Sequence, residues 1–294
     1  MTFFSGIATL QPMIAIDMDD TVVQTTENTH HAIAKLLRHV GHELILPAFF
    51  APRQRSEIAH KCDGSMVTET DHASQEMIRQ ELATLAPQIG FLGEEMDAAD
   101  QLQLLNRCDT PCWCLDPLDG TSNFIAGMPC FTISLGLLHQ GRAIAGWIYD
   151  PVRDELFSAT PSDNAIRCNG TPLPPPNPPA LAEAVGYVDF KRLPHQLAQR
   201  LVIQAPWHSQ RNLGSCALEW AWLASGRSQF IIHGGESVWD FAAGLALANK
   251  SGVVVRDFAG KAPLASRQLN SSIIAAANQS LFDGLHLATQ LGSQ

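Results

Sequence analysis

Residues 113–124 combine side chains and backbone groups that could do phosphate chemistry. An apolar run ends in two carboxylates, Asp116 and Asp119, and a Gly-Thr-Ser segment follows directly at residues 120–122. Aspartates at the end of a buried strand do not ionise readily without a cation or several hydrogen-bond donors, because burial disfavours the charged form. The N–H groups of Gly-Thr-Ser, at a helix start, would form an anion site. A divalent cation beside an anion site is what phosphate-ester chemistry requires.

Other carboxylates stand at the ends of elements that the sequence predicts. They are Asp71, Glu94 and Asp240. Each has an ordinary alternative role, because Asp71 and Asp240 could simply cap helices and Glu94 could face solvent. Together with the first pair they form an oxygen-only set of the kind that holds Mg²⁺. No Cys or His accompanies these acids, which argues against zinc and against a covalent Cys or His phosphatase.

A different acidic motif near the start of the chain offers a competing chemistry. Asp-Met-Asp-Asp-Thr at residues 17–21 follows an apolar run and resembles the nucleophile motif of haloacid-dehalogenase-type phosphatases, in which Asp17 would attack phosphorus. That fold would need a βα series and a later Gly-Asp-x-x-x-Asp motif, which we do not find. We therefore favour acids in the first turn of the coming helix, where negative charge is stabilising.

Three motifs in order resemble the inositol monophosphatase family. They are Gly-Glu-Glu at residues 93–95, Asp-Pro-Leu-Asp-Gly-Thr at 116–121, and Trp-Asp at 239–240 followed by Ala-Ala-Gly. The resemblance runs from about residue 33 to residue 277 and so covers nearly the whole chain. Each motif alone is a weak signal, but the combination is specific.

The resemblance implies a Mg²⁺-dependent phosphoric monoester hydrolase with two to three ions in each active site. The implied metal ligands are Glu94, Asp116, the Leu118 carbonyl, Asp119 and Asp240. One ion would be bound by Glu94, Asp116 and Leu118, and a second by the three aspartates. A third, weaker ion would lie near Glu94 and reach Asp71 through water. Metal-bound water would attack phosphorus directly, without a phosphoenzyme.

The resemblance also implies catalytic and substrate-binding roles. Thr121 and Asp71 would orient and deprotonate the attacking water, and Glu94 belongs to the same catalytic set. The expected substrate-binding residues are Asp119, Gly120, Thr121, Ser215 and His233. Among these, the N–H groups of Gly120 and Thr121 would hold the phosphate.

One departure from the family pattern bears on the substrate. In inositol-specific members, the seventh residue before the Trp-Asp aspartate is a Glu that contacts inositol hydroxyls; here it is His233, and Glu236 is three residues out of register. A site built to pair hydroxyls discriminates strongly, so the change leaves inositol preference open.

Related phosphatases act on histidinol phosphate, 3′-phosphorylated adenosine nucleotides and fructose bisphosphate. We expect a small phosphorylated polyol or metabolite, inositol-1-phosphate-like, with histidinol-phosphate phosphatase or 3′(2′),5′-bisphosphate nucleotidase as alternatives. A non-catalytic scaffold is disfavoured because no implied ligand is missing.

Composition narrows the setting. The chain has 294 residues, of which 46% are hydrophobic and 16% charged, as expected of a compact globular protein. Its formal charge of 19 − 29 = −10 argues against a nucleic-acid partner. The seven cysteines contain no CxxC pair, which favours free thiols in a reducing, cytoplasmic setting. No signal peptide or membrane-spanning run is recognisable. Family members are commonly homodimers, so a homodimer is expected.

Apolar spacing predicts the elements that must position these residues. Helical spacing begins at Ile33 and is expected to end at Pro47, and a second helix is expected from Asp71 to Pro87. Apolar residues alternate over 131–137 and a turn leads into 143–149, which predicts two antiparallel strands.

The second half of the chain reads as helices and short strands. A helical pattern ends at Gly226, a short buried strand is expected at residues 230–232, and a helix opens at Trp239. The proline-rich run 171–179 is the best boundary, which predicts an N-terminal half at 1–175 carrying most metal ligands and a C-terminal half at 176–294 completing the site. The resemblance implies a mixed α+β fold, a layered αβαβα sandwich.

Overall fold

The structure is a computed structural model that describes residues 14–16, 23–25, 27–51, 58–60, 66–107 and 110–290. The competing motif that begins at Asp17 lies outside these residues. In the described part of the chain, no helix is long and apolar enough to cross a membrane.

A seven-stranded sheet forms the centre of the first half, in the order β11-β10-β9-β8-β7-β6-β5. Its strands are β5 (Gly90–Gly93), β6 (Cys112–Asp119), β7 (Thr132–His139), β8 (Arg142–Asp150), β9 (Glu155–Ala159), β10 (Arg167–Cys168) and β11 (Thr171–Pro172). Strands β5 and β6 run parallel, and every other neighbouring pair is antiparallel. The predicted pair of antiparallel strands is thus β7 and β8, joined by a turn in which Gln140 and Gly141 have φ of 48° and 69°. Positive φ at both turn residues is typical of two-residue hairpins.

A five-stranded sheet forms the centre of the second half, in the order β13-β12-β14-β16-β15. Its strands are β12 (Val185–Asp189), β13 (Ser209–Arg211), β14 (Phe230–Ser237), β15 (Val254–Arg256) and β16 (Asn270–Ala276). Strand β14 is longer than the short strand predicted at 230–232, because it continues past an irregularity between His233 and Glu236. The sequence did not predict this longer strand, because the irregularity contains two glycines and glycine normally weakens a strand.

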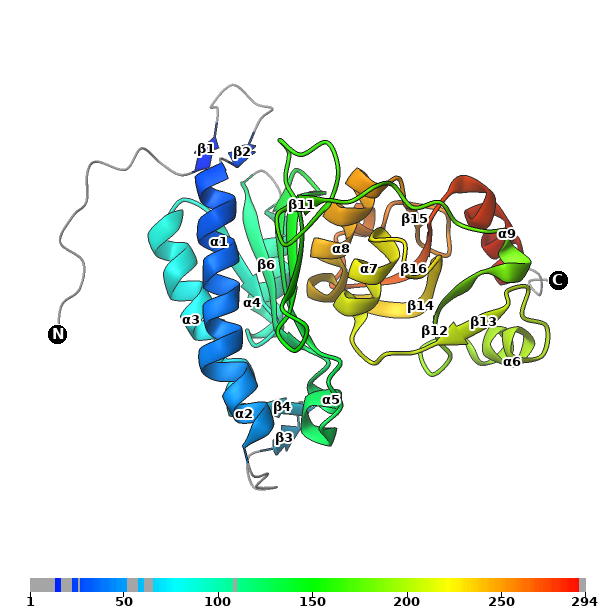
Figure 1. Ribbon diagram of the computed structural model, residues 1–294, viewed down its shortest axis with the longest axis horizontal. Coiled ribbons are helices and arrows are strands. Elements are labelled where there is room, and N and C mark those ends of the chain that lie inside the picture. Colours follow the sequence, from blue (N-terminus) through cyan, green and yellow to red (C-terminus); the bar gives the residue numbers. More distant parts are fainter. Residues whose placement is uncertain are drawn as a thin grey trace.

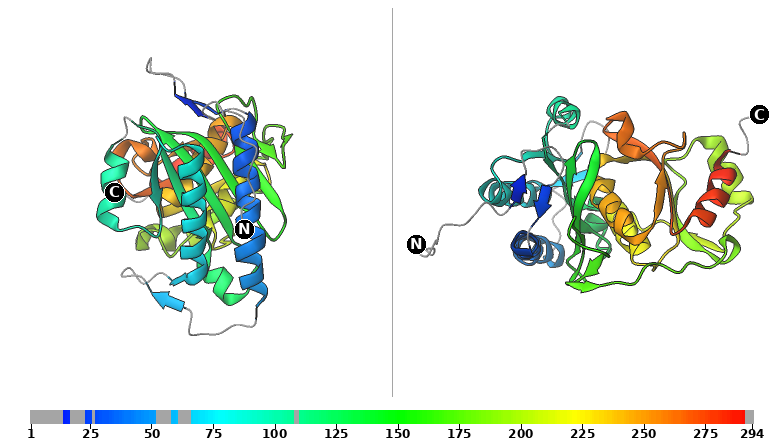
Figure 2. Two further views of the ribbon diagram at one scale, coloured as in Figure 1. Left: turned by 90° about the vertical axis from the view of Figure 1, so that its left-hand side faces the viewer. Right: turned by 90° about the horizontal axis from the view of Figure 1, so that it is seen from above.

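Helices cover both sheets in three layers (Figure 1). The outer layer on the first sheet holds α1 (Glu27–Val40) and α3 (Glu69–Leu85), the middle layer α7 (Cys216–Ala224) and α8 (Val238–Ser251), and the far layer α6 (His195–Ile203) and α9 (Gln279–Gln290). The view from above shows the same succession of helices, sheet, helices, sheet and helices (Figure 2). The fold is therefore the expected αβαβα sandwich.

The remaining described elements are short. They are β1 (Ile14–Ile16), β2 (Val23–Thr25), η1 (Gly41–Ile45), α2 (Leu46–Phe50), β3 (Ile58–His60), β4 (Met66–Thr68), α4 (Ala98–Asn106), α5 (Thr121–Ala126), η3 (Leu181–Glu183) and η4 (Pro263–Ser266). The prediction that Pro47 ends the first helix was wrong. The chain passes from α1 through a π-helical turn, η1, into α2, and Pro47 lies in the first turn of α2. A proline is tolerated there because the first N–H groups of a helix have no partner within it.

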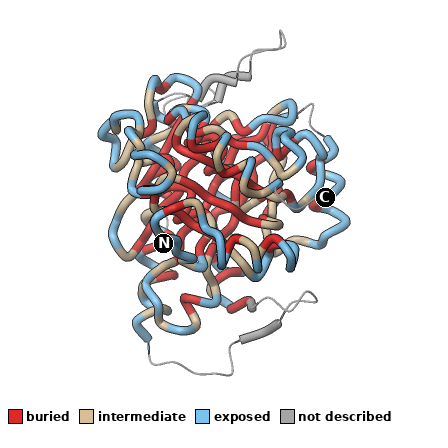
Figure 3. Tube along the Cα trace, turned by 90° about the vertical axis from the view of Figure 1, so that its right-hand side faces the viewer, coloured by how far each residue is buried: buried red, intermediate tan, exposed pale blue. Residues whose placement is uncertain are grey.

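Buried apolar residues form two cores, one on each face of the first sheet. Trp113 and Leu115 of β6 pack toward α1 and α3, whereas Cys112 and Cys114 of the same strand belong to the core around α7 and α8. Buried segments accordingly fill the interior of the molecule (Figure 3). A strand buried on both faces explains why the run before Asp116 is continuously apolar.

Candidate active site

The two acids at the end of β6 lie together because the strand is irregular between them. Asp116 pairs with Ser134 and Asp119 pairs with Thr132. The two aspartates are three positions apart on β6, whereas their partners are two positions apart on β7. In a regular strand, residues three apart would point to opposite faces, and the irregularity removes this conflict. Asp116 is 2% exposed and Asp119 is 7% exposed.

Asp240 completes a cluster with this pair. One carboxylate oxygen from each of Asp116, Asp119 and Asp240 lies within 4.8 Å of the other two. Asp240 is also the third residue of α8, where Ser237 N donates to Asp240 Oδ2 at 3.0 Å in a capping box. The two roles considered for Asp240, helix cap and cluster member, therefore coexist.

Asp71 likewise combines a capping role with a place beside the cluster. Its Oδ2 accepts hydrogen bonds from the hydroxyl and the N–H of Thr68, the latter at 2.8 Å. Its Oδ1 accepts from Thr121 Oγ1 at 2.9 Å, and the same hydroxyl lies 3.0 Å from the carbonyl oxygen of Leu118. The expected Thr–Asp pair is thus in direct contact.

Glu94 reaches the cluster from the neighbouring strand. It follows β5, and its N–H donates to Leu115 O of β6 at 3.0 Å. A hydrogen bond with Glu94 also contributes to the raised pKa of Asp116. The charge of Glu94 helps to raise the pKa of Asp71, Asp116, Asp119 and Asp240. The structure therefore brings Asp116, Asp119 and Asp240 into one cluster and places Asp71 and Glu94 beside it.

Burial and mutual repulsion make this carboxylate cluster electrostatically unfavourable. Burial first, and then repulsion among the acids, raises the pKa of Asp116 and Asp240 well above the ordinary range. Burial also raises the pKa of Asp119 to about 6. Within the described residues, no lysine, arginine or histidine forms an ion pair with these three aspartates. An oxygen-only donor set of this charge fits a hard divalent cation, which would relieve the repulsion.

The segment after Asp119 turns sharply into α5. Gly120 has a φ of 92°, and a Cβ at this position would lie 2.8 Å from Cys130 O. Glycine is therefore required both by conformation and by space. The first N–H groups of α5, beginning with that of Thr121, have no partner within the helix, which leaves them available to an anion.

Ser215 and His233 are engaged inside the protein. Ser215 is 1% exposed and donates its hydroxyl to Asp119 Oδ2. His233 has Nε2 3.3 Å from Asp189 Oδ2, and its Nδ1 accepts from Gly235 N at 3.2 Å. Both ring nitrogens of His233 therefore have partners, and contact of either residue with a substrate stays a prediction.

Glu236 is nearly buried, with 1% of its surface exposed, and it accepts a 2.8 Å hydrogen bond from Trp220 Nε1. Sequence reasoning missed this partner, since Trp220 lies on a different element.

The residues that hold the two capping carboxylates were also missed, although the sequence carries a signal for them. Thr68 precedes Asp71 by three residues and Ser237 precedes Asp240 by three, which is the capping-box spacing. In contrast, nothing local announces that Asp119 accepts hydrogen bonds from the first residues of α7, 97 and 98 residues away in the chain.

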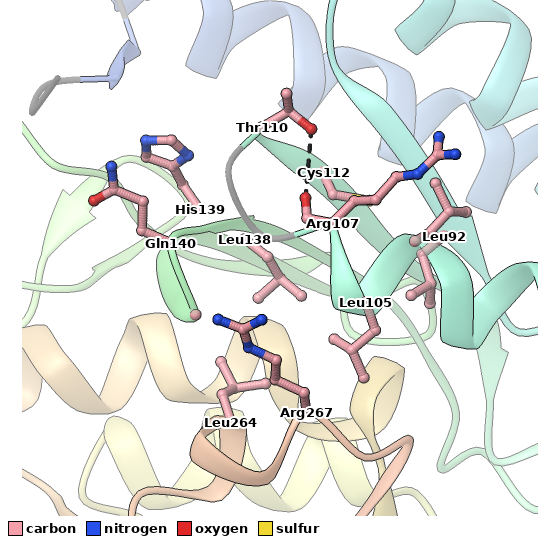
Figure 4. A pocket seen from close by; sticks show the side chains of 12 residues that line it. Leu92, Leu105, Arg107, Thr110, Cys112, Leu138, His139, Gln140, Leu264 and Arg267 are labelled. Carbon is pink, nitrogen blue, oxygen red and sulfur yellow. Dashed lines mark hydrogen bonds between the residues drawn. The ribbon is translucent and has the colours of Figure 1, made fainter. Parts of the chain in front are cut away.

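A separate pocket lies at the other end of β6 (Figure 4). It is lined by Leu92, Leu105, Cys112, Leu138 and Leu264 together with Arg107 and Arg267, among others. Cys112 begins β6 and Asp119 ends it, so roughly 20 Å of strand separates this pocket from the carboxylates. The guanidinium groups of Arg107 and Arg267 do not converge, and the pocket contains none of the candidate site residues.

The αβαβα fold with a buried carboxylate cluster beside a Thr–Asp pair is that of a phosphatase acting on phosphate monoesters. The sequence model of the inositol monophosphatase family matches residues 26–293, and the chain belongs to this family, whose members are metal-dependent. The inositol-1-monophosphatase of Mesorhizobium japonicum is 33% identical over 240 residues, which cover 77% of this chain and 84% of that protein. The fructose-1,6-bisphosphatase/inositol-1-monophosphatase of Thermotoga maritima is 32% identical, with coverage of 77% and 84%. A solved IMPase/NADP phosphatase complexed with Mg²⁺ and phosphate has the same fold, with a TM-score of 0.78 and 21% identity over 91% of this chain and 97% of that one.

Proposed function

We propose that this chain is a Mg²⁺-dependent phosphomonoesterase that hydrolyses a small phosphorylated polyol or metabolite of the inositol-1-phosphate type. The observation that carries the proposal is the cluster of Asp116, Asp119 and Asp240 beside the Thr121–Asp71 hydrogen bond. The cluster has the charge to hold cations, and the hydrogen bond offers a path for a proton.

Two to three Mg²⁺ would be held by carboxylates and one carbonyl. The proposed ligands are Glu94, Asp116, the Leu118 carbonyl, Asp119 and Asp240, with Asp71 reaching a third ion through water. When bound, such ions lower the pKa of water and neutralise charge that accumulates on the phosphoryl oxygens.

Thr121 and Asp71 would guide the attacking water. Thr68 holds Asp71 Oδ2, so Asp71 Oδ1 is the atom that receives the Thr121 hydroxyl. A water that donates to Thr121 Oγ1 would pass a proton to that oxygen while Thr121 passes its own proton to Asp71. Burial raises the pKa of Asp71 and so increases its affinity for this proton. Water would attack phosphorus directly, and no side chain would become phosphorylated.

The phosphate and the remainder of the substrate would lie beside the start of α5. The N–H groups of Gly120 and Thr121 would donate to phosphoryl oxygens, and Asp119 would face the alcohol part of the substrate. One of the relatives described above is a fructose-1,6-bisphosphatase/inositol-1-monophosphatase. His233 stands where inositol-specific members have a Glu that contacts inositol hydroxyls, and both of its ring nitrogens have partners within the protein. Histidinol phosphate and 3′-phosphoadenosine 5′-phosphate are therefore alternative substrates to inositol 1-phosphate.

The setting of the enzyme is part of the proposal. We place it in the cytoplasm as a homodimer, acting on a small metabolite without nucleic-acid or membrane partners. The net charge of −10 disfavours a nucleic-acid partner, and the five free cysteines among the described residues favour a reducing compartment.

Phosphate release from a substrate panel tests the proposal. The panel contains inositol 1-phosphate, histidinol phosphate, 3′-phosphoadenosine 5′-phosphate and fructose 1,6-bisphosphate, each assayed with Mg²⁺ and with EDTA. We expect Mg²⁺-dependent turnover of at least one member and none by an Asp116→Asn variant. Turnover that persists in EDTA, or in that variant, would contradict the metal-based site.

A further inference from the structure

The two oxygens of the Asp119 carboxylate have different sets of hydrogen-bond donors. Oδ2 accepts from the Ser215 hydroxyl and from Ala217 N at 2.8 Å, and Thr132 Oγ1 lies 3.4 Å away. Oδ1 accepts from Cys216 N at 3.1 Å and from no other described residue. Because a carboxylate oxygen has two lone pairs, those of Oδ2 are occupied, whereas Oδ1 keeps one for a cation.

Ser215 stands at the N-cap of α7 but does not cap that helix with its own side chain. A serine in this position usually accepts a hydrogen bond from the second or third helical N–H. Here the Asp119 carboxylate, which comes from β6, accepts from the first two helical N–H groups, and the Ser215 hydroxyl donates to the same carboxylate. The hydroxyl therefore serves Asp119 and not the helix.

Ser215 is more deeply buried than Asp119, the residue that its hydroxyl contacts. The residue is 1% exposed, and the turn after Asp119 is packed against it, since a Cβ on Gly120 would lie 3.1 Å from Ser215 Cβ. The one hydrogen bond that the structure gives the Ser215 hydroxyl among the described residues goes to Asp119, so its effect on the reaction would pass through that carboxylate.

We propose that Ser215 is a positioning residue for the Mg²⁺ centre, not a substrate contact. By holding Oδ2 of Asp119 against α7, it would leave Oδ1 as the oxygen that binds an ion. The inference rests on the proposed function, because it assigns a partner to one of the proposed metal ligands. Removing such a partner typically weakens metal affinity about 10- to 100-fold.

The test compares Mg²⁺ binding in the full chain and two variants by isothermal titration calorimetry. Ser215→Ala removes the hydroxyl in question. Ser158→Ala is a matched control, because Ser158 is equally buried and its hydroxyl has no hydrogen-bond partner among the described residues. We expect about tenfold weaker Mg²⁺ binding for Ser215→Ala and unchanged binding for the control.

Steady-state kinetics separate positioning from substrate contact. A positioning role predicts that Ser215→Ala needs about tenfold more Mg²⁺ for half-maximal rate, recovers most of the rate at saturating Mg²⁺, and keeps the KM of the phosphate ester. A raised KM with unchanged Mg²⁺ affinity would instead restore Ser215 to the substrate site and overturn the inference.

A second variant covers the case in which Ser215→Ala does not fold. Ser215→Gly also removes the hydroxyl, and glycine is among the residues favoured at an N-cap. If a folded variant without the hydroxyl binds Mg²⁺ as tightly as the wild type, the inference about Ser215 is wrong, and the proposed function is unaffected. A wild-type chain that binds no Mg²⁺ would overturn the proposed function and the inference with it.

Discussion

Thr121 Oγ1 donates a 2.9 Å hydrogen bond to Asp71 Oδ1, although 50 residues separate the two in the chain. The other oxygen of Asp71 is held by Thr68, at the entrance to α3. A helix cap on the outer layer and the turn after β6 thus meet at one hydroxyl. In the mechanism proposed above, this hydrogen bond would carry a proton from Thr121 to Asp71.

Removing the Thr121 hydroxyl should impair catalysis more than folding. Thr121→Ala breaks the proposed route from water to Asp71, and general acid–base catalysis is worth about 10²- to 10⁴-fold in rate. We expect kcat to fall by about two orders of magnitude or more, with circular dichroism unchanged. Thr121→Ser retains the hydroxyl and should keep most of the activity. Equal losses in the two variants would show that the methyl group, and not the hydroxyl, matters.

The direct-attack mechanism and the haloacid-dehalogenase alternative predict opposite behaviour at two aspartates. Asp119→Asn removes a proposed metal ligand and should abolish turnover while the fold persists, because the charge that attracts Mg²⁺ is reduced. Asp17→Asn should leave activity nearly unchanged. Phosphate release and circular dichroism on both variants decide the matter, and the reverse pattern would favour Asp17 as nucleophile.

Much of the candidate site could be predicted from the sequence because its acids stand at the ends of recognisable elements. Asp116 and Asp119 follow a continuously apolar run, and Asp240 opens an apolar helix, so their types and positions indicate a shared site. That all three approach within 4.8 Å depends on the irregularity in β6, which no spacing rule foretells.

What the sequence did not predict is mostly long-range. Ser215 contacts Asp119 across 96 residues, and this contact depends on how α7 packs between the two sheets. Pro47 was predicted to end a helix, but the chain continues through the π-helical turn η1, and Pro47 lies in the first turn of α2. Local patterns describe elements well, but they do not tell which element supplies a hydrogen bond to a residue in another layer.

Stability of the metal-free protein should depend on pH in a direction set by the carboxylates. The folded-state pKa of Asp119 is raised by burial to about 6 from an ordinary 3.8, and burial also raises the pKa of Asp116 and Asp240 well above that ordinary value. Between these values the folded state binds more protons than the unfolded state, so the free energy of unfolding falls as pH rises. Asp119 alone would contribute a loss on the order of 3 kcal/mol between pH 4 and pH 7.

Urea unfolding from pH 5 to pH 8 measures this effect. In EDTA, we expect the midpoint to fall as pH rises. With saturating Mg²⁺ the fall should be smaller or reversed, because the ions bind the deprotonated carboxylates and so stabilise the folded state most at high pH. Identical pH profiles with and without Mg²⁺ would argue that these aspartates do not hold the ions.

Close approach of α8 to the first sheet should make one glycine of β8 intolerant of a methyl group. A Cβ on Gly146 would lie 2.5 Å from the carbonyl oxygen of Ala243 and 2.8 Å from its Cα, both backbone atoms. Because α8 carries Asp240, a shift of α8 that accommodates the methyl group would move a cluster carboxylate. Overpacking of this kind typically costs about 1–3 kcal/mol, so Gly146→Ala should lower both the free energy of unfolding and Mg²⁺ affinity.

Gly90 provides the matched control, since it lies in β5 of the same sheet. A Cβ there would have its nearest neighbour, Cys112 Sγ, at 3.5 Å, which is ordinary van der Waals contact. Gly90→Ala should therefore change neither unfolding nor Mg²⁺ binding appreciably. If Gly146→Ala lost stability but kept wild-type Mg²⁺ affinity, the position of α8 would not control the geometry of the carboxylate cluster. Coupled losses would show that packing of the middle helix layer sets the distance between Asp240 and the acids of β6.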